Sequence, residues 1–227
     1  MRVNEIFLSI QGEGLDAGRL CTFVRFTACN IRCGYCDTAY AFYEGGEQSI
    51  PEILEQVSAA GAPMVCLTGG EPMLQQDLPQ LAQALIDGGS HVVIETGGTL
   101  PLGTLPQAVV RVMDVKTPGA LRGDVPHAEF AASKRFHRTH LHHPNLDILT
   151  AEDQVKFVLC DRDDYLWALA FTLEHELHDK VRAVLFSPVH PGLSPDELAA
   201  WIAEDRPPVR LNLQLHKYIW GADVRGV

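Results

Sequence analysis

The sequence has few basic residues and no long apolar run. Its 18 lysines and arginines are outnumbered by 29 aspartates and glutamates, which gives a formal net charge of −11. A protein with a large nucleic-acid footprint normally needs a basic face to neutralise phosphates, so we expect no nucleic-acid partner. No stretch is long and apolar enough to span a bilayer, and no basic segment followed by an apolar one begins the chain. These absences predict a cytoplasmic protein without a membrane partner that acts on a small molecule.

Cysteine is also scarce, with six residues among 227. Six are too few for a disulfide scaffold in a chain of this length, and a hydrophobic content of 46% allows a sizeable core without one. Three of the six lie within eight positions, which indicates a reducing compartment and metal binding. The other three lie singly in apolar runs, where we expect small buried hydrophobic residues: Cys21, Cys66 and Cys160.

The clustered cysteines have the spacing C-x3-C-x2-C at Cys29, Cys33 and Cys36. Three thiolates on a short loop can hold iron or zinc, but a closed structural zinc site needs four protein ligands and no fourth Cys or His lies nearby. An iron–sulfur cluster held by three cysteines keeps one iron free to bind something else. The spacing therefore favours an open cluster site, with zinc and a distant fourth ligand as the alternative.

Strands and helices alternate along most of the chain. We predict strands at 4–10, 20–27, 64–67, 91–95, 109–115, 154–160, 181–186 and 209–215. Helices are predicted after two capping boxes, at 49–52 and at 194–197 with a helix to about 204, and also over 74–86 and 165–177. Strands separated by helices imply parallel βαβ units. On a strict interpretation about six or seven of these eight ranges are such strands, fewer than the eight of a closed barrel. The sequence thus predicts one α/β domain over 1–227, with a partial β/α barrel and a mostly parallel sheet.

Residues 120–151 are the hardest segment to interpret. They carry five histidines with little strand character, at His127, His137, His140, His142 and His143. Their spacing matches no compact ligand set, so we interpret the segment as a solvated helical insertion rather than as a second metal site.

The unusual short motifs of the chain follow predicted strands. They are Gln-Gly-Glu-Gly at 11–14, the cysteine loop, Thr-Gly-Gly-Glu-Pro at 68–72, Thr-Gly-Gly at 96–98 and Lys-Thr-Pro-Gly at 116–119. In a parallel sheet the loops after the strand ends form the active site, so we expect these motifs to meet at one end. Each glycine motif taken singly is equally well explained as a plain turn.

The cysteine motif followed by Gly-Gly-Glu-Pro resembles the radical S-adenosylmethionine superfamily. Within it, the motifs at 11–14, 36–38, 95–98, 116–119 and 215–217 together resemble the 7-carboxy-7-deazaguanine synthase family. This resemblance implies that 6-carboxy-5,6,7,8-tetrahydropterin is converted to 7-carboxy-7-deazaguanine with loss of ammonia, on the route to queuosine. It implies a 4Fe-4S cluster, S-adenosylmethionine cleaved to a radical that takes a hydrogen atom from the substrate, and Mg²⁺. A homodimer and an electron donor such as a flavodoxin or ferredoxin are also implied.

The resemblance assigns the site residues as follows. Cluster ligands would be Cys29, Cys33 and Cys36. Contacts to S-adenosylmethionine would come from Tyr35, Cys36, Asp37, Gly69, Gly70, Glu71, Gly98, Lys116, Thr117 and Pro118. Contacts to the substrate would come from Ile10, Gln11, Gly12, Glu13, Arg25, Thr96, His216, Lys217 and Val227. The Thr38 hydroxyl would ligate a Mg²⁺ ion that also binds substrate oxygens, although from the sequence alone Thr38 is as well explained as a capping residue.

Physical chemistry fits several of these assignments. The Glu71 carboxylate and the adjacent glycine backbone would reach the methionine ammonium, and the Arg25 guanidinium would pair with a substrate carboxylate. A surface ion pair is the alternative for Arg25. Two other functions remain open: a radical activase that modifies a partner protein, and an electron-transfer module without chemistry of its own.

Overall fold

The computed structural model describes residues 1–121, 141–222 and 224–227, and its strands form one nine-stranded sheet in the order β3-β1-β2-β4-β5-β6-β7-β8-β9. β1 pairs antiparallel with β2 and β3, whereas every neighbouring pair from β2 to β9 is parallel. The strands are β1 (Arg2–Ile10), β2 (Leu20–Phe26), β3 (Gly46–Glu47), β4 (Met64–Gly69), β5 (His91–Thr96), β6 (Val110–Asp114), β7 (Gln154–Leu159), β8 (Ala183–Pro188) and β9 (Arg210–Leu211). The predicted α/β class, with a mostly parallel and incomplete barrel, is confirmed.

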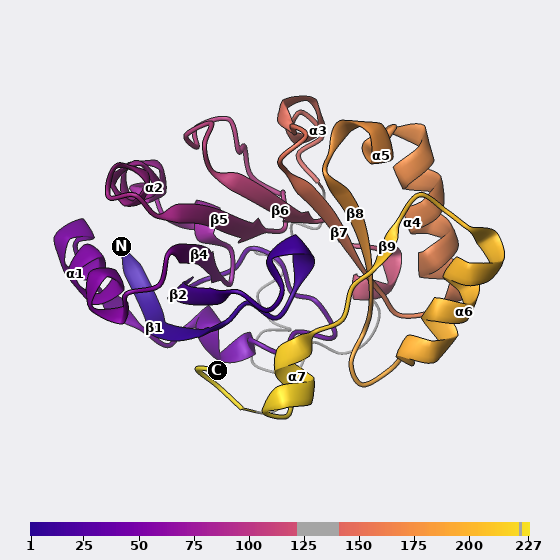
Figure 1. Ribbon diagram of the computed structural model, residues 1–227, viewed down its shortest axis with the longest axis horizontal. Coiled ribbons are helices and arrows are strands. Elements are labelled where there is room, and N and C mark those ends of the chain that lie inside the picture. The colour runs from indigo at the N-terminus through magenta and orange to yellow at the C-terminus, as the bar shows by residue number, and fades with distance from the viewer. Residues whose placement is uncertain (122–140, 223) are drawn as a thin grey trace.

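Helices cover the outer side of the curved sheet (Figure 1). They are α1 (Ile50–Ala60), α2 (Leu78–Asp87), α3 (Asn145–Ile148), α4 (Arg162–Glu174), α5 (Leu177–Lys180) and α6 (Pro195–Asp205), while α7 (Leu215–Ile219) and the C-terminus lie on the open side. Short 3-10 helices occur at η1 (Gly14–Asp16), η2 (Ala39–Phe42), η3 (Pro72–Leu74) and η4 (Pro118–Leu121). In the described part of the chain, no helix is long and apolar enough to cross a membrane.

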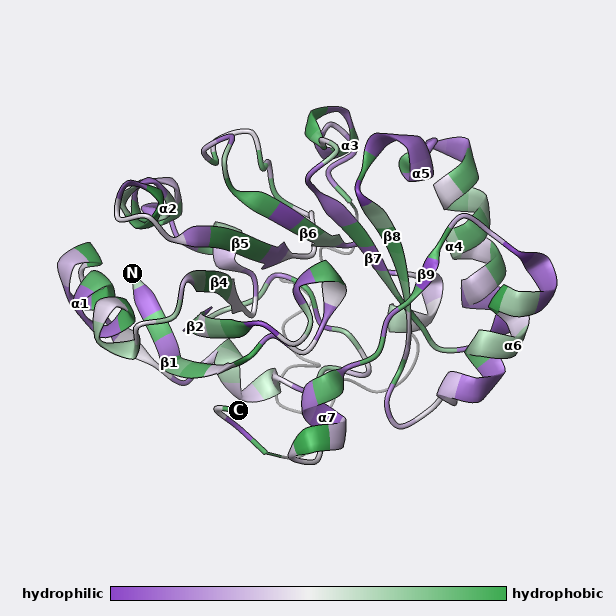
Figure 2. Cartoon of the chain, in the orientation of Figure 1, coloured by the Kyte–Doolittle hydropathy of each residue, from purple (hydrophilic) through white to green (hydrophobic). Residues whose placement is uncertain are grey.

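The central strands are apolar on both faces, as parallel strands covered on both sides require. On β4, Val65 and Leu67 pack in the main core beneath the outer helices, whereas Met64 and Cys66 belong to a smaller cluster inside the barrel. This is the period-two alternation of a strand. Figure 2 shows the strand interiors mainly in green, while helices such as α1 and α6 carry both colours. The inner cluster closes the floor of the barrel and leaves the carboxyl ends of the strands open.

The sequence predicts two helix starts from capping boxes, and the structure contains the capping box at only one of these two starts. At α1 the Ser49 hydroxyl accepts a hydrogen bond from the Glu52 amide, and the Glu52 carboxylate accepts one from the Ser49 amide, so this capping box is confirmed. At α6 the first helical residue is Pro195, as predicted, but Ser194 makes no side-chain cap. The second helix prediction also began too early, because Leu74 ends the separate turn η3 and α2 starts only at Leu78.

The last predicted strand, 209–215, is wrong in extent. β9 contains only Arg210 and Leu211, and α7 begins at Leu215. The backbone leaves the sheet because loop partners replace strand partners: the Asn212 side chain accepts from the Gly14 amide at 2.8 Å, and the Leu215 amide donates to the Gly12 carbonyl at 2.9 Å. These contacts tie the C-terminal segment to the loop at 11–14.

Two of the three isolated cysteines are buried, and the histidine-rich segment is described only in part. Cys21 and Cys66 are fully buried as predicted, whereas Cys160 is only half-buried, because it lies just past the end of β7. His127, His137 and His140 lie outside the described residues, and so does most of the predicted insertion. The described part of the segment contains the short helix α3.

Candidate active site

The open end of the barrel holds a cavity of about 500 Å³ lined by most of the residues that the sequence singled out. These are Ile10, Gln11, Gly12, Glu13, Arg25, Cys29, Cys33, Tyr35, Cys36, Asp37, Thr38, Gly69, Gly70, Thr96, Lys116, His216, Lys217 and Val227. Four predicted residues do not line it: Glu71, Gly98, Thr117 and Pro118. The expected meeting of the post-strand loops is therefore observed.

The cysteine loop forms one wall of this cavity. Cys29 and Cys33 are buried and Cys36 is partly exposed, and all three thiols are free. Two backbone contacts fix the loop's shape: the Ile31 amide donates to the Cys29 sulfur at 3.3 Å, and the Cys36 amide donates to the Cys33 carbonyl at 3.2 Å. Burial raises the pKa of the Cys29 thiol to about 12 and that of Cys36 to about 11, so a metal must displace the protons when it binds.

The donor set fits an iron–sulfur cluster. Three soft sulfur donors on one short loop, with an amide hydrogen bond to one of them, match how proteins hold such clusters. Among the described residues, no three His, Cys, Asp or Glu side chains are grouped closely enough to hold a single metal ion.

The glycines at 69 and 70 allow two backbone segments to touch. A Cβ atom on Gly70 would lie 2.0 Å from the Ala28 carbonyl oxygen, and the Glu71 amide donates to that same oxygen at 2.8 Å. Gly69 has φ +139° and lies against the Phe26 backbone. Both glycines line the cavity. The tightest contact that the missing side chains allow is the one between Gly70 and the backbone of Ala28, the residue just before Cys29.

Glu71 points away from the cavity and into the protein. Its carboxylate is fully buried and accepts hydrogen bonds from the Thr96 hydroxyl at 2.7 Å, the Gly97 amide at 2.9 Å and the Met73 amide at 3.1 Å. Burial raises the pKa of Glu71 in spite of these donors. In this structure the Glu71 carboxylate does not face the cavity where the methionine ammonium is expected. It links the ends of β4 and β5 instead.

In the Lys-Thr-Pro-Gly motif at 116–119, the lysine lines the cavity and the threonine bonds within the protein. Lys116 reaches the cavity, where its ammonium lies 2.9 Å from Asp114 and 5.7 Å from the centroid of the Tyr35 ring. The Thr117 hydroxyl instead donates to the buried Asp164 carboxylate at 2.8 Å, and the Gly119 amide donates to the other oxygen of that carboxylate at 2.8 Å. Thr117 and Gly119 thus form a turn anchored on α4.

This division predicts the phenotype of Thr117→Val. Loss of one hydrogen bond to a buried carboxylate should lower the free energy of unfolding by about 1–3 kcal/mol. Affinity for S-adenosylmethionine should stay within about twofold of the wild type, a difference well under the 1.4 kcal/mol that a tenfold change requires. Thermal unfolding and calorimetric titration measure the two effects. A large affinity loss without destabilisation would instead place Thr117 in the binding site.

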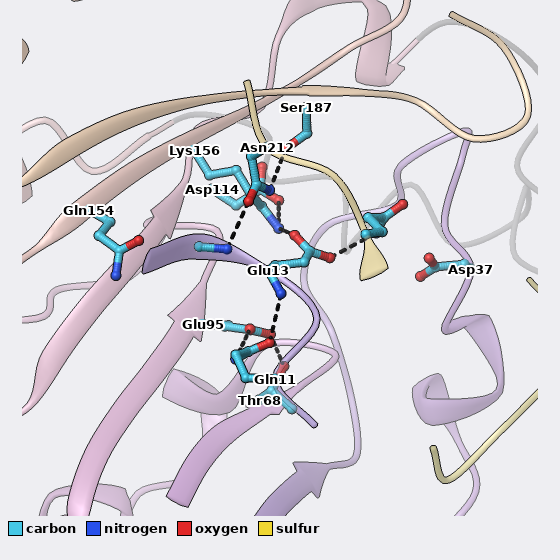
Figure 3. A network of polar contacts seen from close by, with 12 residues as sticks. Gln11, Glu13, Asp37, Thr68, Glu95, Asp114, Gln154, Lys156, Ser187 and Asn212 are labelled. Atoms are coloured by element: carbon cyan, nitrogen blue, oxygen red, sulfur yellow. Dashed lines mark hydrogen bonds and ion pairs between the residues drawn. The ribbon is translucent and has the colours of Figure 1, made fainter. Parts of the chain in front are cut away.

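A buried network of charges forms part of the cavity wall (Figure 3). The Lys156 ammonium lies 2.8 Å from Glu13 and 3.2 Å from Asp114, and the Gln214 amide donates to Glu13 at 2.8 Å. Although burial raises the pKa of Glu13, the Lys156 ammonium outweighs it, so the carboxyl stays below its usual pKa. Burial lowers the pKa of Lys156, but its two carboxylate partners outweigh this effect, and the pKa is raised. The network therefore stays ionised at neutral pH.

Gln11 lines the cavity, and its side chain also forms hydrogen bonds within the protein. Its side-chain amide donates to Glu95 at 3.1 Å, and its oxygen accepts from the Glu13 amide at 3.1 Å. Glu95 also accepts from the Thr68 hydroxyl at 2.9 Å, so one carboxylate organises this part of the wall (Figure 3). The sequence predicted Gln11 as a reader of the substrate ring, whereas the geometry uses much of its hydrogen-bonding capacity internally.

The predictions missed several charged or polar residues that line the cavity: Thr68, Glu95, Asp114, Lys156 and Gln214. A signal for three of them was available. Glu95 and Lys156 lie within mainly apolar strands and Asp114 ends one, and a charged side chain in a doubly covered parallel strand needs a buried partner or a ligand.

Helix α7 closes one side of the cavity. Lys217 lies 2.8 Å from Asp37, so an ion pair joins the C-terminal helix to the cysteine loop. The His216 ring packs against Gly12, where a Cβ would approach the ring nitrogen Nδ1 to 2.3 Å. Burial lowers the pKa of His216, which favours the neutral ring. His216 and Lys217, which follow the predicted strand 209–215, lie in helix α7 in the structure, and both line the predicted site.

Comparison with known proteins identifies the family. Residues 23–115 match the model of the radical SAM superfamily. The chain is 41% identical to the 7-carboxy-7-deazaguanine synthase of Koribacter versatilis over 100% of both chains, and 40% identical to that of Chlorobaculum tepidum over 100% of this chain and 97% of the relative. The chain belongs to the 7-carboxy-7-deazaguanine synthase family.

A solved structure supports the fold of this family member. The crystal structure of QueE from Escherichia coli matches with a TM-score of 0.70 at 23% identity, over 95% of this chain and 94% of that one. Members of the radical SAM superfamily use a 4Fe-4S cluster and S-adenosylmethionine, so the three cysteines and the cavity beside them belong to a radical enzyme.

Proposed function

We propose that this family member converts 6-carboxy-5,6,7,8-tetrahydropterin to 7-carboxy-7-deazaguanine with release of ammonia, in the cavity at the open end of the barrel. One observation carries the assignment of the site: the three free cysteines line the same cavity as Arg25, Glu13 and Thr38. A radical source and a set of groups suited to an anionic, amide-like ring thus share one space. A reducing environment and a strong one-electron donor are required.

Cys29, Cys33 and Cys36 hold the cluster in this proposal. When bound and reduced, the cluster and S-adenosylmethionine together supply a carbon radical that abstracts a hydrogen atom from the substrate. Two buried polar atoms beside the cysteines have no partner in the described residues, namely Asp114 Oδ1 and the Tyr35 hydroxyl. Because buried polar atoms are normally satisfied, both are suited to the polar groups of the cofactor.

The other wall of the cavity binds the substrate in this proposal. Arg25 pairs with the substrate carboxylate, since a guanidinium matches a carboxylate with two parallel hydrogen bonds. Glu13 and Glu95 face the ring as acceptors for its N–H groups. The C-terminal segment, including His216, Lys217 and Val227, lines the cavity on the remaining side and excludes water from a radical intermediate.

Thr38 is the proposed magnesium ligand. Thr38 lines the cavity, and within the described part of the chain its hydroxyl donates only to the neighbouring Asp37 carboxylate, at 3.0 Å. The side chain makes no helix cap, although Thr38 precedes η2. Magnesium takes few protein ligands and completes its octahedron with water and substrate oxygens, so one hydroxyl beside a carboxylate is a sufficient protein contribution. The ion would fix the orientation of the substrate.

Thr38→Ala should lower turnover by about 10- to 100-fold, the effect of losing a positioning contact. It should also weaken the stimulation of turnover by Mg²⁺ and leave the iron content of the reconstituted protein unchanged. Thr38→Ser is the matched control, because it retains the hydroxyl and should retain most of the magnesium response. Loss of iron equal to the loss of activity would contradict the magnesium role.

Anaerobic reconstitution followed by mass spectrometry tests the function itself. With reductant, S-adenosylmethionine, magnesium and 6-carboxy-5,6,7,8-tetrahydropterin, the reaction should yield 7-carboxy-7-deazaguanine and ammonia in equal amounts. Formation of 5′-deoxyadenosine without any deazapurine would instead favour a radical activase. The homodimer, the flavodoxin or ferredoxin donor and the cytoplasmic location stay predictions, which light scattering, reduction assays and cell fractionation test.

A further inference from the structure

Among the described residues, the guanidinium of Arg25 is hydrogen-bonded at one edge, through Nε. Arg25 on β2 lies directly opposite Glu5 on β1, next to an irregularity in the pairing of the two strands. Its Nε atom lies 2.7 Å from Glu5 Oε1. Within the part of the chain that the structure describes, the Nη groups have no acceptor, and Arg25 lines the cavity. The fork of the two Nη atoms is thus left available to a ligand.

The partner of Arg25 is itself fixed by a third residue. The Tyr40 hydroxyl donates to the same oxygen, Glu5 Oε1, at 2.8 Å. The guanidinium carbon lies 5.6 Å from the centroid of the Phe7 ring and 6.0 Å from that of the Tyr40 ring. A planar cation held at Nε and bordered by two aromatic rings has little freedom to rotate.

A surface ion pair would look different. An exposed Arg–carboxylate pair prefers the two-bond fork, in which the carboxylate occupies the edge that could bind a ligand. Here Glu5 takes a single bond to Nε, and both side chains are largely buried, with exposed fractions of 16% for Arg25 and 24% for Glu5. The arrangement forgoes the two-bond contact within the protein, and among the described residues it leaves the Nη fork of a cavity-lining arginine without an acceptor.

We propose that Glu5, fixed by the Tyr40 hydroxyl, is a positioning residue that orients the Arg25 fork for the carboxylate of the substrate and so sets the enzyme's preference for a carboxylated pterin. This inference rests on the proposed function, because it requires Arg25 to bind that carboxylate. Glu5 touches neither substrate nor cofactor in this account. Its whole effect passes through Arg25.

A double-mutant cycle tests this dependence. Arg25→Ala should raise the KM for the substrate by about 100-fold or more, and Glu5→Ala by about 10-fold, at kcat values changed far less. In the Arg25→Ala background, Glu5→Ala should have no further effect on KM. Glu5→Gln, whose amide oxygen can still accept from Nε, should recover part of the loss. Tyr40→Phe, which retains the ring and cannot disturb packing much, should raise KM by about threefold.

Binding without turnover supplies a second readout. Calorimetric titration should show that the wild type binds 7-carboxy-7-deazaguanine more tightly than its carboxamide, and that this ratio falls by about 10-fold in Glu5→Ala. Iron content and affinity for S-adenosylmethionine should be unchanged. Asp205→Ala is the matched control, since it removes the acceptor of a partly exposed Arg162 pair at 2.8 Å outside the cavity lining and should alter neither ratio nor KM.

The outcomes separate this inference from the function beneath it. If Arg25→Ala leaves KM unchanged, the proposed carboxylate contact is wrong, and the positioning role falls with it. If Arg25→Ala raises KM but Glu5→Ala does not, or if the two effects add, Arg25 binds the carboxylate without help from Glu5 and only the inference is overturned. A loss of carboxylate preference in both single variants and no further loss in the double variant supports it.

Discussion

Cys33→Ala is expected to reduce deazapurine formation by more than about 1,000-fold, because the cofactor carries a step that no protein side chain can perform. Cys33 is buried in the cavity wall, and burial raises the pKa of its thiol, so the residue is inert unless a metal replaces the proton. Iron per chain after anaerobic reconstitution should fall in parallel with activity. Cleavage of S-adenosylmethionine without substrate should be lost as well.

Cys21→Ala is the matched control for this variant. Cys21 is fully buried in the inner cluster beneath the cavity and is not one of the proposed ligands. Removing either sulfur should cost about 1 kcal/mol of stability, a typical effect for a buried substitution. Cys21→Ala should therefore match Cys33→Ala in thermal stability but keep its iron and its activity. Equal loss of iron in both variants would show that the effect of Cys33→Ala is structural.

Gly70→Ala is expected to damage the cysteine loop directly. The new methyl group would lie 2.0 Å from the Ala28 carbonyl oxygen and 2.6 Å from the Ala28 carbonyl carbon, distances at which backbone must move. Overpacking of this kind costs about 1–3 kcal/mol, and more where no flexible side chain can yield. Because Ala28 precedes Cys29, the displaced backbone should carry a cluster ligand with it.

The measurements for Gly70→Ala are thermal unfolding and iron content. For a chain of this size, 1 kcal/mol corresponds to about 2–4 °C, so a cost of about 1–3 kcal/mol should lower the melting temperature by about 2–12 °C. Iron incorporation should fall further than that destabilisation explains. Gly103→Ala is the control, since a Cβ there meets nothing within 4 Å and φ is not positive. A Gly70→Ala protein with wild-type iron and lower affinity for S-adenosylmethionine would mean that Gly70 serves the cofactor rather than the loop.

The arrangement of loops at the barrel's open end was predictable because it follows from strand direction. Once apolar runs alternate with helices, the strands from β2 to β9 are parallel, and the motifs that follow them lie at the same end. Cys29 and Thr38 lie beside the other loops for this reason. The loop at 11–14 is the exception, because it follows the antiparallel strand β1 and is held in the cavity wall by contacts of Gln11 with Glu95 and of Glu13 with Lys156. The same reasoning cannot fix which way one side chain in a turn faces. Glu71 and Thr117 stand in predicted binding motifs, yet they face Thr96 and Asp164 inside the protein.

The remaining differences depend on partners that are distant in sequence. Lys156 becomes part of the site only because β7 lies next to β6, where Asp114 ends the strand, and because Glu13 enters from the other side. The helix α7 replaces a predicted strand because Asn212 and Leu215 bond to the loop at 11–14. Local periodicity contains neither contact, so both could be found only in the folded chain.

In the proposed function, one cavity both generates a radical and rearranges a pterin. The most direct measurement is the number of 7-carboxy-7-deazaguanine molecules formed for each S-adenosylmethionine consumed, in one anaerobic reaction with reductant, magnesium and 6-carboxy-5,6,7,8-tetrahydropterin. If the hydrogen atom returns to the product, S-adenosylmethionine acts as a true cofactor, and the wild type should form many product molecules for each one consumed, whereas Cys33→Ala should form none. Consumption of S-adenosylmethionine with no deazapurine formed would contradict the account.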